Sequence, residues 1–311
     1  MLQSRNLLGL IPVLAVVVAQ DDTAPGGTTK VGGHLGYIPN EAAAIIFFLI
    51  YFLTALHVAW LLFRHKGRYM ATLVAAGFCY SAGLILRIPY RSNYDKIGFY
   101  IIMSMFTVLS PCGFIATVYV LLGRLARHLH AEEFLMIKPR ILTPLFVEHA
   151  TVTLLIQATG GALAGSSDVD KAKLSSHIFL AGLVLQLVSF SIFICIFLFF
   201  LYRLKSNRRA QWNLPHEEPT RRHWKGVVLA MGISCLGIII RCAYRTIEGG
   251  QGFEGYLLTH EIFFYVLDCL PLWFAVLVYN YIWPPSILIE SKGVDGVQGI
   301  ELVQNDSRQK V

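Results

Sequence analysis

The chain has 311 residues, of which 55% are hydrophobic and 14% are charged, and its mean hydropathy is +0.58. This composition excludes an ordinary soluble domain and indicates a polytopic membrane protein. The net charge of +7 is concentrated in short segments between apolar runs. That placement is typical of cytoplasmic loops and does not indicate a nucleic-acid partner.

The first 19 residues have the pattern of a signal peptide. Arg5 precedes an apolar run at 7–18, and the segment ends at Val17-Val18-Ala19, which fits the small-residue rule for cleavage. The run is short for a membrane span, and the segment that follows is polar and rich in glycine. We therefore expect residues 1–19 to be a cleaved signal peptide and 20–40 to be an extracellular segment. The alternative is an eighth helix.

Seven further runs are apolar enough to cross a membrane as helices, each of which needs about 20 residues. They lie at 41–63, 69–88, 97–122, 141–164, 177–202, 226–244 and 256–283. The sequence therefore predicts an all-α fold, a seven-transmembrane-helix bundle over residues 41–285. The tail, 286–311, is polar and glycine-rich, so we expect it to be disordered.

The distribution of Lys and Arg predicts the orientation of the bundle. The loops after the first, third and fifth runs carry basic clusters, at 64–68, 124–140 and 203–225, whereas the opposite loops are acidic or mixed. Basic loops face the cytoplasm. The N-terminus is therefore expected outside and the C-terminus inside, which agrees with a signal peptide.

All six cysteines lie in apolar runs, and none of them falls in a loop. A disulfide framework is therefore not expected, and no paired spacing indicates a metal site. The sequence also lacks a phosphate-binding loop of the G-x-x-x-x-G-K-[ST] type and an H-E-x-x-H zinc pattern. It predicts no cofactor, no ATP-driven motor and no catalytic residue.

Charged residues at the end of the sixth run and within the seventh are the main candidates for function. Arg241, Arg245 and Glu248 have the i, i+4, i+7 spacing that places side chains on one helix face. The same spacing relates Glu261 and Asp268 through Tyr265, and His260 is expected near the outer rim. Charges are costly in hydrocarbon, so such residues normally pair or bind a ligand.

A short connection makes the sixth and seventh spans antiparallel neighbours, so the two columns are expected to face each other. Two interpretations stay open. The charges form a clamp between two helices, or they line an outward-facing polar cavity. In such a cavity a carboxylate would hold a cationic headgroup or a proton, and an arginine would hold an anion.

The second and fourth runs add further polar candidates. Arg87 ends the second run and is long enough to extend its charge to the membrane surface. Glu148 and His149 lie in the fourth run, where a hydrated or paired couple is the simpler explanation. Gln157 precedes a run of small residues that favours close helix packing.

The full motif set resembles the fungal RTA-like family, also called the lipid-translocating exporters. The resemblance covers residues 37–286 and is most specific in three linked patterns, R-x-x-Y-R-x-x-E, G-x-x-G-Y-L-x-x-H-E and F-Y-x-x-D-x-x-P. These patterns comprise Arg241, Tyr244, Arg245, Glu248, Gly252, Gly255, Tyr256, Leu257, His260, Glu261, Phe264, Tyr265, Asp268 and Pro271. The candidate polar site consists of Arg241, Tyr244, Arg245, Glu248, His260, Glu261, Tyr265, Asp268, Glu148, His149, Gln157 and Arg87.

The chain departs from the family pattern at several positions. Tyr80 and Leu84 stand where the second span usually has an acid and a tyrosine, although Gly83 and Arg87 are present. Ala150 stands where the fourth span usually has an aspartate. After the seventh span, the usual H-P-G is W-P-P at 283–285. A ligand that depended on the two absent acids would not bind here in the same way.

The resemblance implies a seven-span plasma-membrane protein, not an enzyme, that exports or translocates amphiphilic lipids. Sphingoid long-chain bases and sterol-like toxic compounds would be its cargo, and resistance to them its result. Membrane lipids and amphiphilic small molecules are the implied partners. The main alternative is a seven-helix receptor that regulates lipid or stress responses. A membrane-embedded hydrolase that uses Glu148, His149, His260 or Asp268 is a third interpretation.

Overall fold

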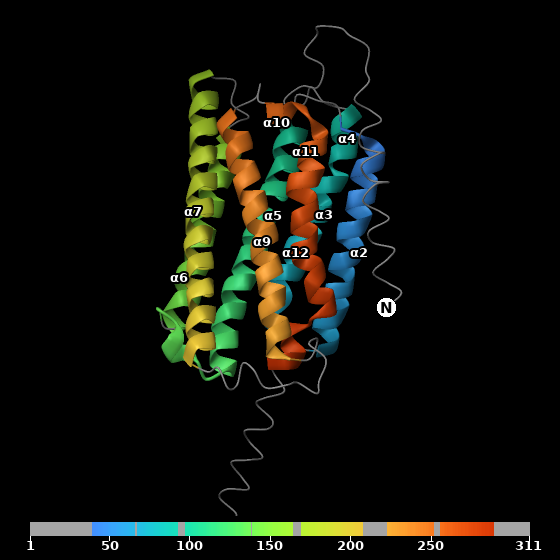
Figure 1. Cartoon of the computed structure of the whole chain (residues 1–311). Helices are drawn as coiled ribbons and strands as arrows, with labels where there is room; N and C mark the ends of the chain where they lie inside the picture. The colour runs from blue at the N-terminus through green and yellow to red at the C-terminus, as the bar shows by residue number, and fades with distance from the viewer. Residues whose placement is uncertain are drawn as a thin grey trace, which may run out of the picture.

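A computed structural model describes residues 39–65, 67–92, 97–137, 139–163, 169–207, 223–251 and 256–288. The expected signal peptide, nearly all of the expected extracellular segment and most of the tail lie outside these residues. The helices of the described segments run side by side along one axis and form an elongated bundle (Figure 1).

Seven helical spans in the described segments are long and apolar enough to cross a membrane, which confirms the predicted fold class. The first six spans are α2 (Glu41–His65), α3 (Ala71–Ile85) with α4 (Arg87–Ser92), α5 (Ile97–His128), α6 (Pro139–Leu163), α7 (Val169–Asn207) and α9 (Trp224–Gln251). After the short helix α10 (Tyr256–Thr259), the seventh comprises α11 (Glu261–Phe263), the π-helical segment η5 (Phe264–Cys269) and α12 (Leu270–Tyr281). Two 3₁₀ helices, η2 (Arg68–Met70) and η3 (Glu132–Phe134), lie in connections.

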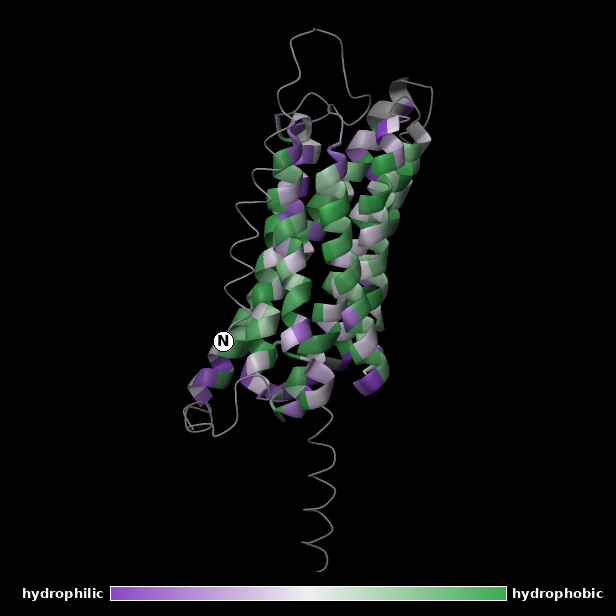
Figure 2. Ribbon diagram, turned by 90° about the vertical axis from the view of Figure 1, so that its right-hand side faces the viewer, coloured by the Kyte–Doolittle hydropathy of each residue, from purple (hydrophilic) through white to green (hydrophobic). Residues whose placement is uncertain are grey.

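The bundle has two polar ends and an apolar length between them (Figure 2). We call the end at which α9 finishes and α10 lies the α10 end, and the other the opposite end (Figure 1). Large apolar side chains such as Leu53 and Leu155 are exposed along the spans. Such faces suit contact with lipid, because lipid tails are as apolar as leucine.

Several helices extend beyond the apolar runs that predicted them. α7 begins at Val169 instead of 177, and α9 continues to Gln251 instead of ending at 244. Hydropathy detects only the segment that matches hydrocarbon, whereas a helix continues into polar residues because its backbone hydrogen bonds are formed within the segment. Arg245 and Glu248 are consequently helical.

The seventh span is interrupted where the sequence predicts one continuous helix. His260 has an extended backbone, with φ −118° and ψ 111°, and separates α10 from α11. Six residues of η5 are then π-helical, and Pro271 is the second residue of α12, which follows. Proline has no N–H to donate to the preceding turn, and a π-helical turn is one way in which a helix accommodates this.

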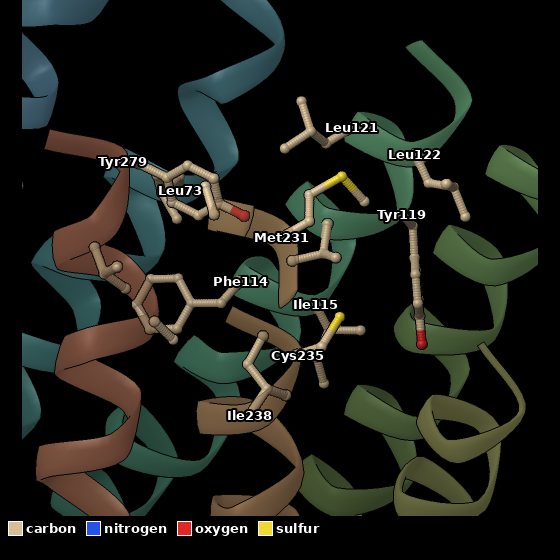
Figure 3. Close-up of a cluster of buried hydrophobic side chains, with 14 of the residues drawn as sticks. Leu73, Phe114, Ile115, Tyr119, Leu121, Leu122, Met231, Cys235, Ile238 and Tyr279 are labelled. Atoms are coloured by element: carbon tan, nitrogen blue, oxygen red, sulfur yellow. The ribbon is translucent and has the colours of Figure 1, made fainter. Parts of the chain in front are cut away.

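An apolar core packs α3, α5, α9 and α12 together (Figure 3). Phe114 and Ile115 of α5 meet Met231 and Ile238 of α9, and all four are almost completely buried. Ile238 lies three residues before Arg241, so the two share one face of α9. Core packing therefore turns Arg241 toward the inside of the bundle.

All six cysteines are free thiols. Cys112, Cys235, Cys242 and Cys269 are buried, and Cys79 and Cys195 are exposed on the spans. Cys235 and Cys242 act as small apolar side chains in the packing, whereas the sulfurs of Cys112 and Cys269 each accept a hydrogen bond.

Candidate functional site

α9 and the seventh span come close together at a glycine. A Cβ atom at Gly237 would lie 2.2 Å from the carbonyl oxygen of Pro271 and 3.0 Å from the Cβ of Ala275. Only glycine allows this separation of the two backbones. Ser234, one turn earlier, donates its hydroxyl to the carbonyl of Ala275 at 2.6 Å. The contact places the next turn of α9, which carries Arg241, against η5.

Arg241 and Asp268 form an ion pair inside the bundle. The Nε atom of Arg241 lies 2.7 Å from Oδ1 of Asp268, and neither side chain has any exposed surface. Arg241 also donates from Nη2 to the carbonyl of Thr107 on α5 at 2.8 Å. A buried charge is tolerated only when it is paired and hydrogen-bonded. These contacts therefore tie α5, α9 and η5 together.

Arg245 is shared between two carboxylates. Its Nε donates to Oδ2 of Asp268 at 2.9 Å, and its Nη2 contacts the same oxygen. Its Nη1 donates to Oε2 of Glu248 at 2.9 Å. The hydroxyl of Tyr244 donates to Oε1 of Glu248 at 3.1 Å. Both oxygens of Glu248 thus accept a hydrogen bond.

We call Arg241, Arg245, Glu248 and Asp268 the α9–η5 cluster. Exposure within it is graded along α9. The side chains of Arg245 and Glu248 are 13% and 11% exposed, whereas those of Arg241 and Asp268 are at 0%. Within the described residues, the exposed part of the cluster is therefore at Arg245 and Glu248, its members nearer the α10 end.

Glu261 belongs to a second buried group at the α10 end. Arg87 donates from Nη2 to its Oε1 at 3.1 Å, and the backbone N–H of Asn40 donates to its Oε2 at 2.8 Å. The side chain of Asn40 in turn accepts from the N–H of Ala43 and caps α2. The carboxylate thus joins α2, α4 and α11. Arg87 is 3% exposed, so the expectation that it reaches the membrane surface is wrong.

Phe264 connects the two charged groups. Its ring lies 4.2 Å from the guanidinium carbon of Arg87 and 5.2 Å from that of Arg245. Arginine is attracted to the face of an aromatic ring, and the attraction increases where water is excluded. One aromatic side chain of η5 therefore contacts an arginine from each group.

The π-helical segment is also held from α2 and α3. Tyr51 donates its hydroxyl to the carbonyl of Cys269 at 2.7 Å, and Tyr80 donates to the Cys269 sulfur at 3.3 Å. Tyr80 stands where the resembled family usually has an acid, and its hydroxyl comes next to the residue that follows Asp268. Tyr51 and Thr107 lie in apolar runs of the sequence. The sequence therefore did not indicate that the Tyr51 hydroxyl would bind η5 or that the Thr107 carbonyl would bind Arg241.

The predicted facing columns form only in part. Arg241 and Arg245 meet Asp268, as expected, but Glu261 turns to α2 and α4. Tyr265 stacks on Phe47 of α2, with ring centroids 4.6 Å apart. The reason is the backbone of the seventh span. The i, i+4, i+7 rule holds for α-helical turns, and the wider turn of η5 rotates the residues before it away from α9.

Gln157 takes part in a different contact. It is completely buried and donates from Nε2 to Oε1 of Gln186 at 2.7 Å, which links α6 to α7. A Cβ atom at Gly160 would lie 2.7 Å from the backbone of Phe179, so the small residues allow close packing as predicted. These contacts hold two helices together, and none of them involves the α9–η5 cluster.

Three remaining candidates also lie outside the cluster. His260 is half-buried at the break before α11, where its ring packs against Tyr256 with centroids 4.3 Å apart. Glu148 is exposed on α6, and His149 is half-buried beside it. Within the described residues, no three His, Cys, Asp or Glu side chains are grouped so that they could hold a metal ion.

The two charged groups together contain three arginines and three carboxylates, each in at least one ion pair. A cationic ligand would therefore have to displace an arginine from a carboxylate, and an anionic ligand a carboxylate from an arginine. Arg245 is the arginine of these groups that pairs with two carboxylates. Chemically, the arrangement suits a reaction in which a charged ligand replaces one partner of an ion pair. Such an exchange needs no redox step or covalent intermediate.

Comparison with known proteins finds relatives of this chain in Saccharomyces cerevisiae. Protein RTA1 of Saccharomyces cerevisiae is 28% identical over 274 residues, which cover 80% of this chain and 84% of that protein. The sphingoid long-chain base transporter RSB1 of the same species is 27% identical over 278 residues, covering 80% of this chain and 72% of that protein. The protoporphyrin uptake protein 1 of that species is 31% identical over 200 residues, covering 64% and 63%.

No solved structure matches the chain. The profile of the family described as "RTA1 like protein" matches residues 73–292, which include the whole α9–η5 cluster, five of the seven described spans and most of the second. The chain is an integral membrane protein and belongs to the RTA1-like family.

Proposed function

We propose that the protein is a transporter that exports amphiphilic lipids or lipid-like toxic compounds across the plasma membrane. Sphingoid long-chain bases are the cargo with the best support, because a relative of that name matches 80% of the chain. The relatives with descriptive names are called a transporter and an uptake protein, and neither is called an enzyme. Resistance to the exported compound is the cellular consequence.

The observation that carries this proposal is a charged cluster inside the membrane-spanning part of the bundle, in which Arg245 and Glu248 are partly exposed. A long-chain base has an ammonium group on an apolar tail. The headgroup needs a carboxylate, and the tail needs an apolar surface, such as the exposed faces of the spans. Glu248 is the most accessible carboxylate of the cluster, and it lies one helical turn from Arg245.

Arg245 is the residue on which the proposed movement depends. An ammonium group that bound Glu248 would take over the place of Arg245 there, and Arg245 would keep its two contacts with Asp268. Its guanidinium would keep Asp268 as a partner, shared with Arg241, so the cluster would carry the one net positive charge of the ligand. An exchange in which each arginine keeps a carboxylate partner costs less in an apolar environment than one that leaves a lone charge.

The same exchange would serve an anionic amphiphile. Protoporphyrin, the compound in the name of one relative, carries carboxylates, which would pair with an arginine of the cluster. A group with equal numbers of positive and negative partners accepts either sign by exchange. The proposal therefore extends to amphiphiles of both charges. With no nucleotide-binding pattern in the sequence, we propose that a proton or substrate gradient drives transport.

The direct test measures movement of a fluorescent long-chain base across proteoliposomes that contain the purified protein. We expect Glu248→Gln to lower the transport rate at least tenfold, because the neutral amide keeps hydrogen bonds but cannot pair with an ammonium group. Glu132→Gln, a loss of the same charge on an exposed connection, is the matched control and should transport normally.

Two results would contradict the proposal. Transport by Glu248→Gln at the wild-type rate would exclude a functional charge at this position. No movement of any labelled base or porphyrin by the wild-type protein, with binding retained, would favour the receptor-like regulator. In cells, deletion of the protein should reduce tolerance to long-chain bases, and the wild-type gene should restore it.

A further inference from the structure

One face of α6 carries a regular exposed stripe with a charged residue in its middle. Ile141, Leu145, Val152 and Leu155 have exposed fractions between 45% and 58%, and Glu148, also exposed, lies between them. The steps from one of these five residues to the next alternate between four and three, and Pro144 and Thr151, also exposed, lie beside them. This is the heptad spacing by which one helix packs along another. α6 is also the least buried of the seven spans.

Glu148 is too deep for its carboxylate to reach water easily. It lies eight residues after Arg140, at the start of the span, or about 12 Å along the helix axis at 1.5 Å per residue. An ionisable residue at this depth normally faces a partner inside a protein assembly. Glu148 instead points out of the described bundle, between the apolar Leu145 and Val152 and one turn from the hydroxyl of Thr151.

We propose that this face packs against the same face of a second copy of the chain, with Glu148 of each copy paired to His149 of the other. Copies in one membrane insert in the same orientation, so their α6 helices run parallel about a twofold axis. In parallel packing with this repeat, a residue at the position of Glu148 inserts between four residues of the facing helix. Those four are the counterparts of Leu145, Glu148, His149 and Val152.

The chemistry of the face identifies a second copy as the occupant. Glu148 is an acid, and the half-buried His149 next to it is a base, so the face is complementary to itself. A lipid tail offers Glu148 no hydrogen-bond donor, and the charged headgroup of a lipid lies nearer the membrane surface. Polar side chains that pair across helices are a known means of association in membranes.

Cysteine cross-linking of the full-length protein in native membranes tests the geometry. In a background with Cys79 and Cys195 replaced by serine, we expect Val152→Cys to form a disulfide-linked dimer on mild oxidation. Val188→Cys is the matched control, because Val188 is similarly exposed on α7, outside the proposed contact. Equal cross-linking of the two variants, or cross-linking of Val188→Cys alone, would overturn the proposal.

A second measurement tests the role of the charge. Energy transfer between copies carrying donor and acceptor labels on their C-terminal tails should fall at least fivefold for Glu148→Leu. The outward position of Glu148 lets leucine replace it without disturbing the bundle. Glu148→Gln retains hydrogen bonding and should keep most of the transfer. Unchanged transfer in Glu148→Leu would contradict pairing through Glu148.

Discussion

Asp268 is the residue on which the charge balance of the α9–η5 cluster depends. It accepts from Arg245 and pairs with the completely buried Arg241. Without it, Arg241 would keep only its hydrogen bond to the carbonyl of Thr107. Removing one partner of a buried ion pair costs about 3–5 kcal/mol, whereas replacing both partners by apolar residues is often close to neutral.

We therefore expect Asp268→Leu to lower the free energy of unfolding by about 3–5 kcal/mol. The double variant Arg241→Met with Asp268→Leu should recover most of that loss, because Arg245 still pairs with Glu248. Thermal unfolding of the purified protein in detergent measures both. A double variant less stable than the single one would show that Arg241 is not the charge left unpaired.

Transport by the same double variant separates the two interpretations of the cluster. A clamp alone would regain transport when stability returns, whereas a ligand site would stay inactive. At the scale of single residues, the sequence predicted the pairing of Arg241 and Arg245 with Asp268 from spacing and the cost of a lone charge. It did not predict Asn40 as a partner of Glu261, because a backbone N–H carries no signal in the sequence.

At the scale of helices, the position of the cluster depends on how closely α9 approaches the seventh span. Gly237 allows that approach. It faces the carbonyl of Pro271, which is the second residue of α12, the helix after η5. A methyl group at Gly237 would force the helices apart or shift Pro271. Since Arg241 is one turn farther along α9, the change would also alter its distance from Asp268.

We expect Gly237→Ala to lower the free energy of unfolding by about 1–3 kcal/mol, as overpacking of a close contact usually does. Gly232→Ala is the matched control on the same helix, because a Cβ atom there would meet nothing within 4 Å. The control should be neutral or slightly stabilising, since alanine favours helix more than glycine does. Equal melting temperatures for the two variants would contradict the close approach.

Helix periodicity explains why the seventh span was the hardest element to predict. Its apolar run reads as one helix, and the α-helical repeat then puts Glu261 and Asp268 on one face. The extended His260 and the π-helical η5 change that rotation. Pro271 is visible in the sequence. Whether a helix kinks, forms a π-helical turn or ends at a proline depends on the segments packed against the helix.

At the scale of the whole molecule, the described basic residues are unevenly distributed between the two ends. The opposite end carries many of them, namely Arg64, Arg68, Arg124, Arg127, Arg140, Arg203, Lys205 and Lys225. Near the α10 end, Lys171 is exposed, Arg91 is half-buried in an ion pair with Glu41, and Arg87 is buried in its own ion pair. Basic residues accumulate on the cytoplasmic side. We therefore propose that the α10 end, and with it the open side of the cluster, faces outward.

Labelling with a membrane-impermeant maleimide on intact spheroplasts checks this orientation. In a background with Cys79 and Cys195 replaced by serine, Ser92→Cys at the α10 end should be labelled. Glu132→Cys at the opposite end should react only after permeabilisation. Both positions are exposed, so they differ only in the side of the membrane they face. The reverse pattern would invert the proposed topology and the proposed direction of access.

The sequence by itself determined the number of spans, their order and the close packing of α6 on α7, because hydrocarbon thickness sets the length of an apolar run and small residues allow close approach. It also identified the arginines and carboxylates that must find partners. The tertiary structure alone decided which partners they have. The choice of Arg87 and Asn40 for Glu261, and of Thr107 for Arg241, depends on helix rotation and on the π-helical turn at Phe264–Cys269. Both are set by packing between segments far apart in the chain, whereas a periodic pattern reports only on residues within the same helix.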